Sequence, residues 1–228
     1  DEDTIVGCAM VSGIHWFIVG LFVSTEPEHV SRRVRRNMAK FGTSRFLMAP
    51  WMPGGRRGLL LLTIHLIALT AIGRMDVWPE WVHNTVTVTA LYVYIYVAIG
   101  ATVGRLGQTV SPEFRPAHAR VLTILIGALA MIAPYLPAAF GFTRWAREFR
   151  LVEVANPGGT LMYIADRRIS GNPMVDDVLM ILWWVAGIAL LVNLRAMITG
   201  VAEVRDWQPA AAQRSSVSEL EESGAAAS

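Results

Sequence analysis

Residues 4–23, TIVGCAMVSGIHWFIVGLFV, form a run of 20 residues without a charged side chain. A helix of about 20 apolar residues crosses the roughly 30 Å hydrocarbon layer of a bilayer. Four further apolar runs follow at residues 58–73, 85–103, 121–140 and 178–201. We therefore predict an all-α fold, a polytopic integral membrane helical bundle with about five transmembrane helices and an interfacial helix.

The composition of the chain agrees with a membrane protein. Of its 228 residues 54% are hydrophobic and 17% are charged, against about 25% charged residues in an average soluble domain. The mean hydropathy is +0.42, and a soluble domain of this length has no means of hiding so much apolar surface. These values exclude a disordered chain and most soluble enzymes. The net charge of +2 gives no reason to expect nucleic-acid binding.

Helices rather than strands are the expected spanning form, because each backbone group in lipid must be paired within its own segment. The run at 58–73 is short, so it is either a span that continues past Arg74 or a buried or re-entrant helix. Pro134 and Pro137 lie late in the fourth run and predict a kink in a full crossing. A re-entrant hairpin is the alternative at that place.

The distribution of basic residues predicts the orientation. The loops at 24–57 and 104–120, together with the segment from Arg195 onward, carry 14 of the 20 Lys and Arg residues. The loops at 74–84 and 141–177 carry the other 6. Because basic loops stay in the cytoplasm, we predict a multi-pass protein of the cell inner (cytoplasmic) membrane. Its N-terminus would lie outside and its C-terminus in the cytoplasm.

The polar segments have patterns of their own. Residues 142–152 place four apolar side chains at helical spacing, which predicts a short helix in the plane of the interface. Turn residues at 156–159 end it, and a second short helix is expected over 160–168. We expect residues 1–207 to form the transmembrane domain and the Ala/Ser/Glu-rich residues 208–228 to form a disordered cytoplasmic tail.

The first residues are Asp1-Glu2-Asp3, without a Met or a positively charged leader. The first apolar run is therefore not a standard signal peptide. We read the chain as processed or as a segment of a longer protein, with an upstream part missing.

His15 and His65 lie inside the first two runs, where ionisable groups are costly and often functional. If these runs are antiparallel neighbours, both histidines lie roughly 10–12 Å from the same surface. Such a pair is able to ligate haem b, hold a metal or relay protons. The alternative is that each histidine hydrogen-bonds a carbonyl or a hydroxyl group within the bundle. We expect no metal and no cofactor, with haem b only under the redox alternative.

Motifs of catalysis are missing from the sequence. It contains no G-x-S-x-G, no H-E-x-x-H and no phosphate-binding G-K-[ST] ending. Cys8 is the only cysteine, which excludes an internal disulfide and a cysteine-based metal cluster. We therefore expect that the chain is not an enzyme and has no catalytic residue.

Gly100 and Gly104 form a G-x-x-x-G pattern in the third run. Glycines four residues apart allow two helix backbones to approach closely. The pattern predicts tight packing within the bundle, or else a homodimer interface.

The first loop carries a basic cluster at Arg32, Arg33, Arg35 and Arg36. One use is an anchor on the anionic lipid bilayer, worth about 1 kcal/mol per arginine near the surface. The other use is a docking helix for a cytoplasmic partner subunit.

The layout resembles the permease of ABC-2 type transporters: a long basic first loop, three following spans of which the last carries prolines, paired external interfacial helices and a last span. Three segments also look similar to C-terminal membrane regions of large permease-like proteins: SRRVRRNMAKFGTSRFLMAPWMPGGRRGLL (31–60), LYVYIYVAIGATVGRL (91–106) and ARVLTILIGALAMIAPYLP (119–137). The resemblance implies that residues 4–201 are spans two to six of six. It also implies a cytoplasmic coupling helix in the first loop that contacts a separate ATPase. Short external helices would lie between the last two spans. A substrate path would lie at a dimer interface.

The sequence thus predicts a permease-like transport component that acts with a separate ATPase. Two alternatives stay open. One is a membrane redox subunit that binds haem b through His15 and His65, and the other is a membrane anchor or assembly protein without transport of its own.

Overall fold

The structure is a computed structural model, which describes residues 2–26, 47–52, 54–73, 78–136, 151–165 and 172–205. These residues form helices and turns, with no strand among them. The long helices are α1 (Glu2–Ser24), α3 (Gly55–Gly73), α4 (Glu80–Val110), α5 (Pro116–Ile132) and α8 (Pro173–Arg205). The short ones are η2 (Ala49–Trp51), η3 (Ala133–Tyr135), η5 (Leu151–Ala155) and α7 (Pro157–Ala165).

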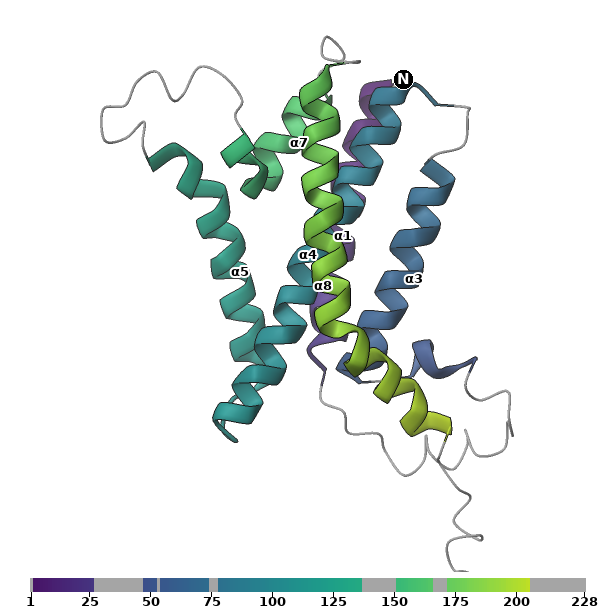
Figure 1. Ribbon diagram of the computed structural model, residues 1–228, viewed down its shortest axis with the longest axis vertical. Coiled ribbons are helices and arrows are strands. Elements are labelled where there is room, and N and C mark those ends of the chain that lie inside the picture. Colours follow the sequence, from purple (N-terminus) through teal and green to yellow (C-terminus); the bar gives the residue numbers. More distant parts are fainter. Residues whose placement is uncertain are drawn as a thin grey trace, which may run out of the picture.

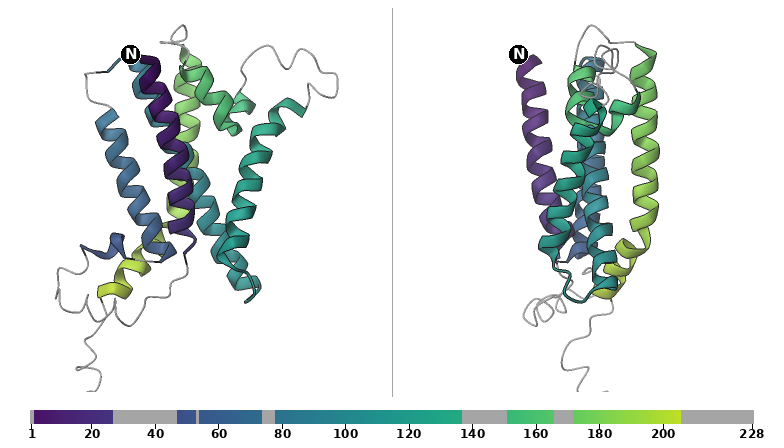
Figure 2. Two further views of the ribbon diagram at one scale, coloured as in Figure 1. Left: turned by 180° about the vertical axis from the view of Figure 1, so that it is seen from behind. Right: turned by 90° about the vertical axis from the view of Figure 1, so that its left-hand side faces the viewer.

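The long helices run alternately down and up through the bundle (Figure 1). We call the end that holds the first residues of α1, α4 and α8 the upper end, as it is drawn, and the opposite end the lower end. The short helices η5 and α7 lie at the upper end between α5 and α8, and the last turns of α8 bend across the lower end (Figures 1 and 2).

α4 is the central helix, and it packs against α1, α3, α5, α7 and α8. Of its most apolar stretch, 67% of the residues are buried, whereas the corresponding shares in α1, α5 and α8 are 22%, 11% and 22%. The outer helices therefore expose apolar side chains such as Ile14, Leu125 and Leu191. An exposed apolar surface of this extent fits lipid as the solvent rather than water.

Four helices are long and apolar enough to cross a membrane: α1, α4, α5 with its continuation to Tyr135, and α8. The prediction of an all-α fold is confirmed for the described residues, and the four long apolar helices fit a membrane protein. α3 has 19 residues and carries Arg56 and Arg57 in its first turn. It is not among these four helices. The number of five spans stays a prediction.

The core gathers around α4. Val88, Val97 and Ala98 of α4 are almost fully buried. They share one apolar cluster with leucines of α3 and with a stripe on α8 formed by Val178, Leu182 and Ala186. Each fully buried side chain of this size contributes about 1.5–3 kcal/mol relative to exposure to water. In lipid, the gain comes from close packing instead.

Two buried threonines of α4 are satisfied along the helix itself. The Thr85 hydroxyl donates to the carbonyl of Trp81 at 2.7 Å, and the Thr89 hydroxyl donates to the carbonyl of Thr85 at 2.8 Å. This bond to the preceding turn is the usual one for a threonine within a helix. It lets a segment rich in threonine stay helical in an apolar surrounding.

Gly100 and Gly104 lie on the face of α4 that meets α5. A Cβ at Gly100 would lie 2.8 Å from both Leu21 Cδ1 of α1 and Thr123 Oγ1 of α5. A Cβ at Gly104 would lie 3.4 Å from the Cβ of Ala119. The structure therefore places the G-x-x-x-G pattern against helices of the same chain.

The end of α5 shows the effect of Pro134. The α-helix ends at Ile132 and continues as the 3₁₀ turn η3, in which carbonyls pair with N–H groups three residues on. For Met131 that position is Pro134, which has no N–H. The side-chain amide of Asn156 donates to the Met131 carbonyl instead, at 3.3 Å. Pro137 lies outside the described residues.

The pair of short helices η5 and α7, which we call the upper wedge, is tied to α4. The Tyr92 hydroxyl donates to the carbonyl of Val154 at 2.5 Å, and the Tyr96 hydroxyl donates to the carbonyl of Ala155 at 2.9 Å. Both tyrosines point from the middle of α4 to η5. The wedge is thus held against the central helix by two hydrogen bonds from one face.

The prediction of a turn at residues 156–159 is wrong in its bounds. α7 begins at Pro157, and the Asn156 side chain accepts a hydrogen bond from the Gly159 N–H at 3.0 Å. Asparagine before a helix and proline at its first position are signals for a helix start. Residues 142–150 of the predicted interfacial helix and the tail at 208–228 lie outside the described residues.

The loop predicted at residues 104–120 is much shorter in the structure. α4 continues to Val110, and α5 begins at Pro116. The predicted loop began where the apolar run ends, just before Arg105. A helix can continue beyond the apolar core of a membrane, and α4 continues for five residues after Arg105. The 31 residues of α4 rise about 46 Å, well beyond the roughly 30 Å of hydrocarbon.

Replacing Gly100 by Leu should destabilise the bundle. The added side chain would overlap Leu21 and Thr123, and overpacking of this kind typically costs about 1–3 kcal/mol. We expect a lower melting temperature in detergent, followed by circular dichroism. Gly7→Ala is the matched control, since a Cβ there meets nothing within 4 Å; equal melting temperatures for both variants would contradict the packing.

Candidate functional site

Polar side chains gather at the lower end of the bundle and connect its helices. We call this group the lower polar layer; it comprises Thr25, Glu26, Arg56, Arg57, Arg105, Arg120, Asn193 and Glu203. Buried polar and charged side chains are costly unless they are paired, so a connected group of them serves function or assembly. The layer is therefore one of two candidate sites.

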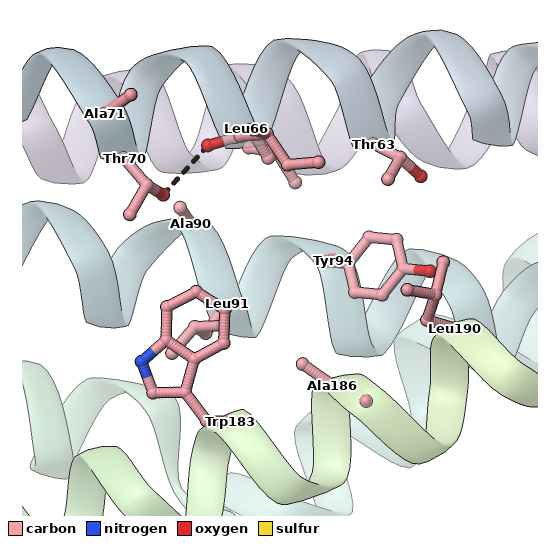
Figure 3. A pocket seen from close by; sticks show the side chains of 12 residues that line it. Thr63, Leu66, Thr70, Ala71, Ala90, Leu91, Tyr94, Trp183, Ala186 and Leu190 are labelled. Atoms are coloured by element: carbon pink, nitrogen blue, oxygen red, sulfur yellow. Dashed lines mark hydrogen bonds between the residues drawn. The ribbon is translucent and has the colours of Figure 1, made fainter.

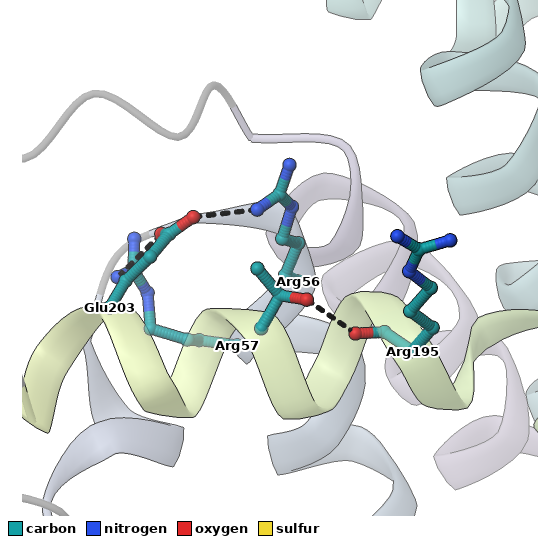
Figure 4. A network of polar contacts seen from close by, with 5 residues as sticks. Arg56, Arg57, Arg195 and Glu203 are labelled. Atoms are coloured by element: carbon teal, nitrogen blue, oxygen red, sulfur yellow. Dashed lines mark hydrogen bonds and ion pairs between the residues drawn. The ribbon is translucent and has the colours of Figure 1, made fainter.

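Glu203 of α8 joins the start of α3. Its Oε1 accepts a hydrogen bond from Arg56 Nη1 at 2.6 Å, and its Oε2 lies 3.9 Å from Arg57 Nη1 (Figure 4). The Arg57 side chain is fully buried, whereas Glu203 is 40% exposed. Gly200 permits this approach, because a Cβ there would lie 2.9 Å from the Cβ of Arg56. The bent end of α8 thus covers the first turn of α3.

Asn193 of α8 joins α4. Its side chain is buried, and its amide donates to the Thr102 hydroxyl at 3.2 Å and to the carbonyl of Ala189 at 2.7 Å. Its Oδ1 accepts from Arg105 Nη2 at 2.5 Å. Each polar atom of this amide is paired, which is the condition for burying it without a large cost.

The end of α1 completes the layer. Arg120 of α5 donates from Nε to the Thr25 hydroxyl at 2.9 Å, and its guanidinium lies 4.1 Å from the ring centroid of Phe22. The carbonyl of Glu26 accepts from the Gly55 N–H at 2.9 Å, and its carboxylate accepts from the Gly54 N–H at 3.3 Å. The layer therefore connects α1 with both α3 and α5.

A small polar cavity of about 60 Å³ opens within the layer. Ser24, Thr25 and Glu26 line it from α1, and Arg56 and Arg105 line it from α3 and α4. This volume has room for several water molecules, each of which needs about 10–15 Å³ of such space. The cavity can hydrate the arginines at the lower end.

The second candidate site is a larger cavity of about 490 Å³ between α3, α4 and α8. Its lining is mostly apolar, from residues such as Leu66, Leu91 and Leu190 (Figure 3). Tyr94 and Thr63 add hydroxyl groups at one end. The volume lies in the range of small-molecule sites, which are lined by apolar side chains with a few polar groups.

The Trp16 ring contacts both histidines proposed for haem b. Its ring centroid is 5.8 Å from that of His15 and 5.0 Å from that of His65. Nδ1 of His65 lies 2.9 Å from the carbonyl of Leu61, at hydrogen-bonding distance. Such a bond satisfies one ring nitrogen within the bundle and is also the usual support of a histidine that binds a metal through Nε2. The haem b site therefore stays a prediction.

The structure places the other predicted site residues as follows. Arg32, Arg33, Arg35 and Arg36 lie outside the described residues. Cys8 is exposed on α1. Within the described ranges, no three His, Cys, Asp or Glu side chains stand close enough to hold a metal ion.

Residues missed from the sequence are Tyr94, Asn193 and Glu203. A tyrosine within an apolar run resembles a residue of the interfacial aromatic belt, and only the depth of Tyr94 in the run signals otherwise. Asn193 could have been noticed as an amide two positions before Arg195, at the end of a span. The sequence carries no signal for Glu203, because only the bend of α8 brings this residue to α3.

No family model, curated protein or solved structure matches the chain. The fold and the two sites are therefore the observations from which a function is argued.

Neutralising Glu203 should weaken the contact between α8 and α3. Glu203→Gln removes the negative charge that faces two arginines, one of them fully buried. Because Glu203 is itself partly exposed, we expect a loss of only about 1–2 kcal/mol, seen as a lower melting temperature. Glu113→Gln, at an exposed position near the same end, is the control. If the two variants melt at the same temperature at low salt, Glu203 does not hold α8 against α3.

Proposed function

We propose that the chain is a permease-like transport component that acts with a separate ATPase. The supporting observation is the way in which the lower polar layer closes the base of the loop between α1 and α3. A subunit driven by an external ATPase needs a cytoplasmic segment that passes movement to several spans. The layer offers such a connection.

The base of the loop is fixed on both sides. Glu26 lies two residues after the end of α1 and accepts hydrogen bonds from the N–H groups of Gly54 and Gly55, where α3 begins. The next residues, Arg56 and Arg57, reach Glu203 of α8. A force on the loop would therefore act on α1, α3 and α8 together.

The proposed orientation places the lower end in the cytoplasm. The described arginines belong to the first turn of α3, the last turns of α4 and α8, and the start of α5, and these helix ends lie at the lower end (Figure 1). Basic residues flanking spans stay in the cytoplasm. In this proposal α3 also crosses the membrane, which brings the number of spans to five, since α3 runs beside α4 in the opposite direction (Figure 1). The membrane would be the cell inner membrane.

The upper wedge gives independent support. In the ABC-2 type resemblance, short external helices lie between the last two spans. Here η5 and α7 lie between α5 and α8 in sequence, and α7 contacts both α4 and α5. The exposed apolar faces of α1, α5 and α8 leave room for a second copy, so that a substrate path would form at a homodimer interface.

The basic cluster of the first loop provides the test. The four arginines 32, 33, 35 and 36 should be replaced together by Glu, and the tagged chain purified from membranes of its own host. We expect vanadate-sensitive ATP hydrolysis to co-purify with the wild-type chain. The co-purified activity should fall at least tenfold in the variant. The four glutamates would repel the acidic surface that an ATPase docked on four arginines is expected to present.

Arg115→Glu is the matched control, since Arg115 is exposed at the lower end but lies in another loop. ATPase activity that never co-purifies, or that survives the fourfold reversal, would contradict the proposal and favour an anchor or assembly protein. A Soret absorbance band that disappears in His65→Ala would instead show the haem b redox subunit.

A further inference from the structure

We infer that the cavity between α3, α4 and α8 binds a neutral, membrane-dissolved molecule that presents a carbonyl acceptor on an apolar body, of the isoprenoid quinone type. This inference goes beyond the proposed transport function and does not depend on it. It rests on one buried hydroxyl group, on the lining of the cavity and on its depth.

The Tyr94 hydroxyl is the polar group that the cavity leaves unsatisfied. Tyr94 is only 7% exposed, and its hydroxyl makes no hydrogen bond. The Thr63 side chain is close enough to interact with it weakly. The Thr63 hydroxyl donates to the carbonyl of Leu59 at 2.8 Å, however, and no hydrogen bond of acceptable geometry joins it to Tyr94. The Tyr94 hydroxyl points into the space between α3 and α8 (Figure 3).

The neighbouring tyrosines on α4 show that this is not a general feature of the helix. The hydroxyls of Tyr92 and Tyr96 both donate to carbonyls of the upper wedge. A buried hydroxyl without a partner costs free energy, and in an apolar cavity a ligand with an acceptor removes that cost. Tyr94 therefore selects a ligand that carries an acceptor such as a carbonyl oxygen.

The lining excludes a charged ligand. None of the described residues around the cavity is charged, and most are aliphatic or aromatic. A charged group placed there would lose its hydration without gaining a partner. On the open side, Ile67 and Trp183 are exposed on the surface that faces lipid. The ligand would enter sideways from the bilayer.

The depth of Tyr94 favours a quinone over a phospholipid. Tyr94 lies 14 residues after Glu80 in α4, which is about 21 Å along the helix axis and close to the midpoint of its length. The ester carbonyls of a phospholipid stay at the edge of the hydrocarbon layer, about 15 Å from its centre. An uncharged quinone has no such anchor and can place its carbonyl at this depth.

The test measures quinone binding to the full chain in detergent. Decylubiquinone is titrated while tryptophan fluorescence is followed, because Trp183 lines the cavity and quinones quench tryptophan. We expect saturable quenching by the wild-type chain. Tyr94→Phe should weaken the apparent affinity about three- to tenfold, the effect of one lost hydrogen bond. Tyr96→Phe is the matched control and should leave the affinity unchanged.

A second pair of variants fills the cavity. A Cβ at Gly187 meets nothing within 4 Å, so Gly187→Leu should fold and occupy the space from α8. Ala71→Leu does so from α3, where Ala71 lines the cavity and is exposed. Saturable quenching should disappear in both, at an unchanged melting temperature.

Three results would overturn the inference: no saturable quenching, quenching that survives both filling variants, or equal affinities of Tyr94→Phe and wild type. Transfer to nanodiscs of phosphatidylcholine supplies the last arm. If this phospholipid abolishes quinone binding at a mole ratio of one quinone to one lipid, the cavity is a phospholipid site and the inference is wrong. Retained binding supports it.

Discussion

Lipid offers no hydrogen-bond partner to the protein backbone, and the structure depends on how α4 meets this constraint. α4 places its peptide groups in one continuous helix of 31 residues and returns its threonine hydroxyls to carbonyls of the preceding turn. Other polar side chains in its middle, such as Thr87 and Tyr92, are buried against protein, because five other helices cover α4. The outer helices can then expose aliphatic faces to the bilayer. Polar side chains are thus collected in the centre of the bundle, and apolar side chains cover its exterior.

This separation explains where the two candidate sites lie. Side chains that need water or charge partners gather at the lower end, where Arg57, Arg105 and Arg120 connect neighbouring helices. In the middle of the bundle, the described polar side chains are mainly hydroxyl groups and the imidazoles of His15 and His65. The buried Tyr94 hydroxyl of α4 has no hydrogen-bond partner, and it opens into the cavity between α3, α4 and α8. The lower polar layer therefore suits mechanical connection, and the cavity suits an uncharged ligand.

The sequence predicted the helical membrane fold because composition and run length report the solvent directly. It did not predict which helix is central. The segment TVTVTALYVYIYV in α4 is no more apolar than the others, and its burial depends on packing partners far apart in the chain. Element bounds were missed where local signals compete, as at Asn156, where turn residues also serve as a helix cap. The contact of Glu203 with Arg57 was invisible because it depends on the bend of α8. The glycines of the G-x-x-x-G pattern were found because close packing leaves a local pattern.

The central claim is that α4 is enclosed by protein while its neighbours face lipid. Spin labels on single cysteines, introduced after replacing Cys8, test it through collision with oxygen dissolved in the bilayer. Labels at Val97 and Ala98 of α4 should show low oxygen accessibility, and labels at Leu125 of α5 and Leu191 of α8 should show high accessibility. If the labels on α4 collide with oxygen as often as those on α5 and α8, the central position of α4 is wrong and the sites built around it do not exist.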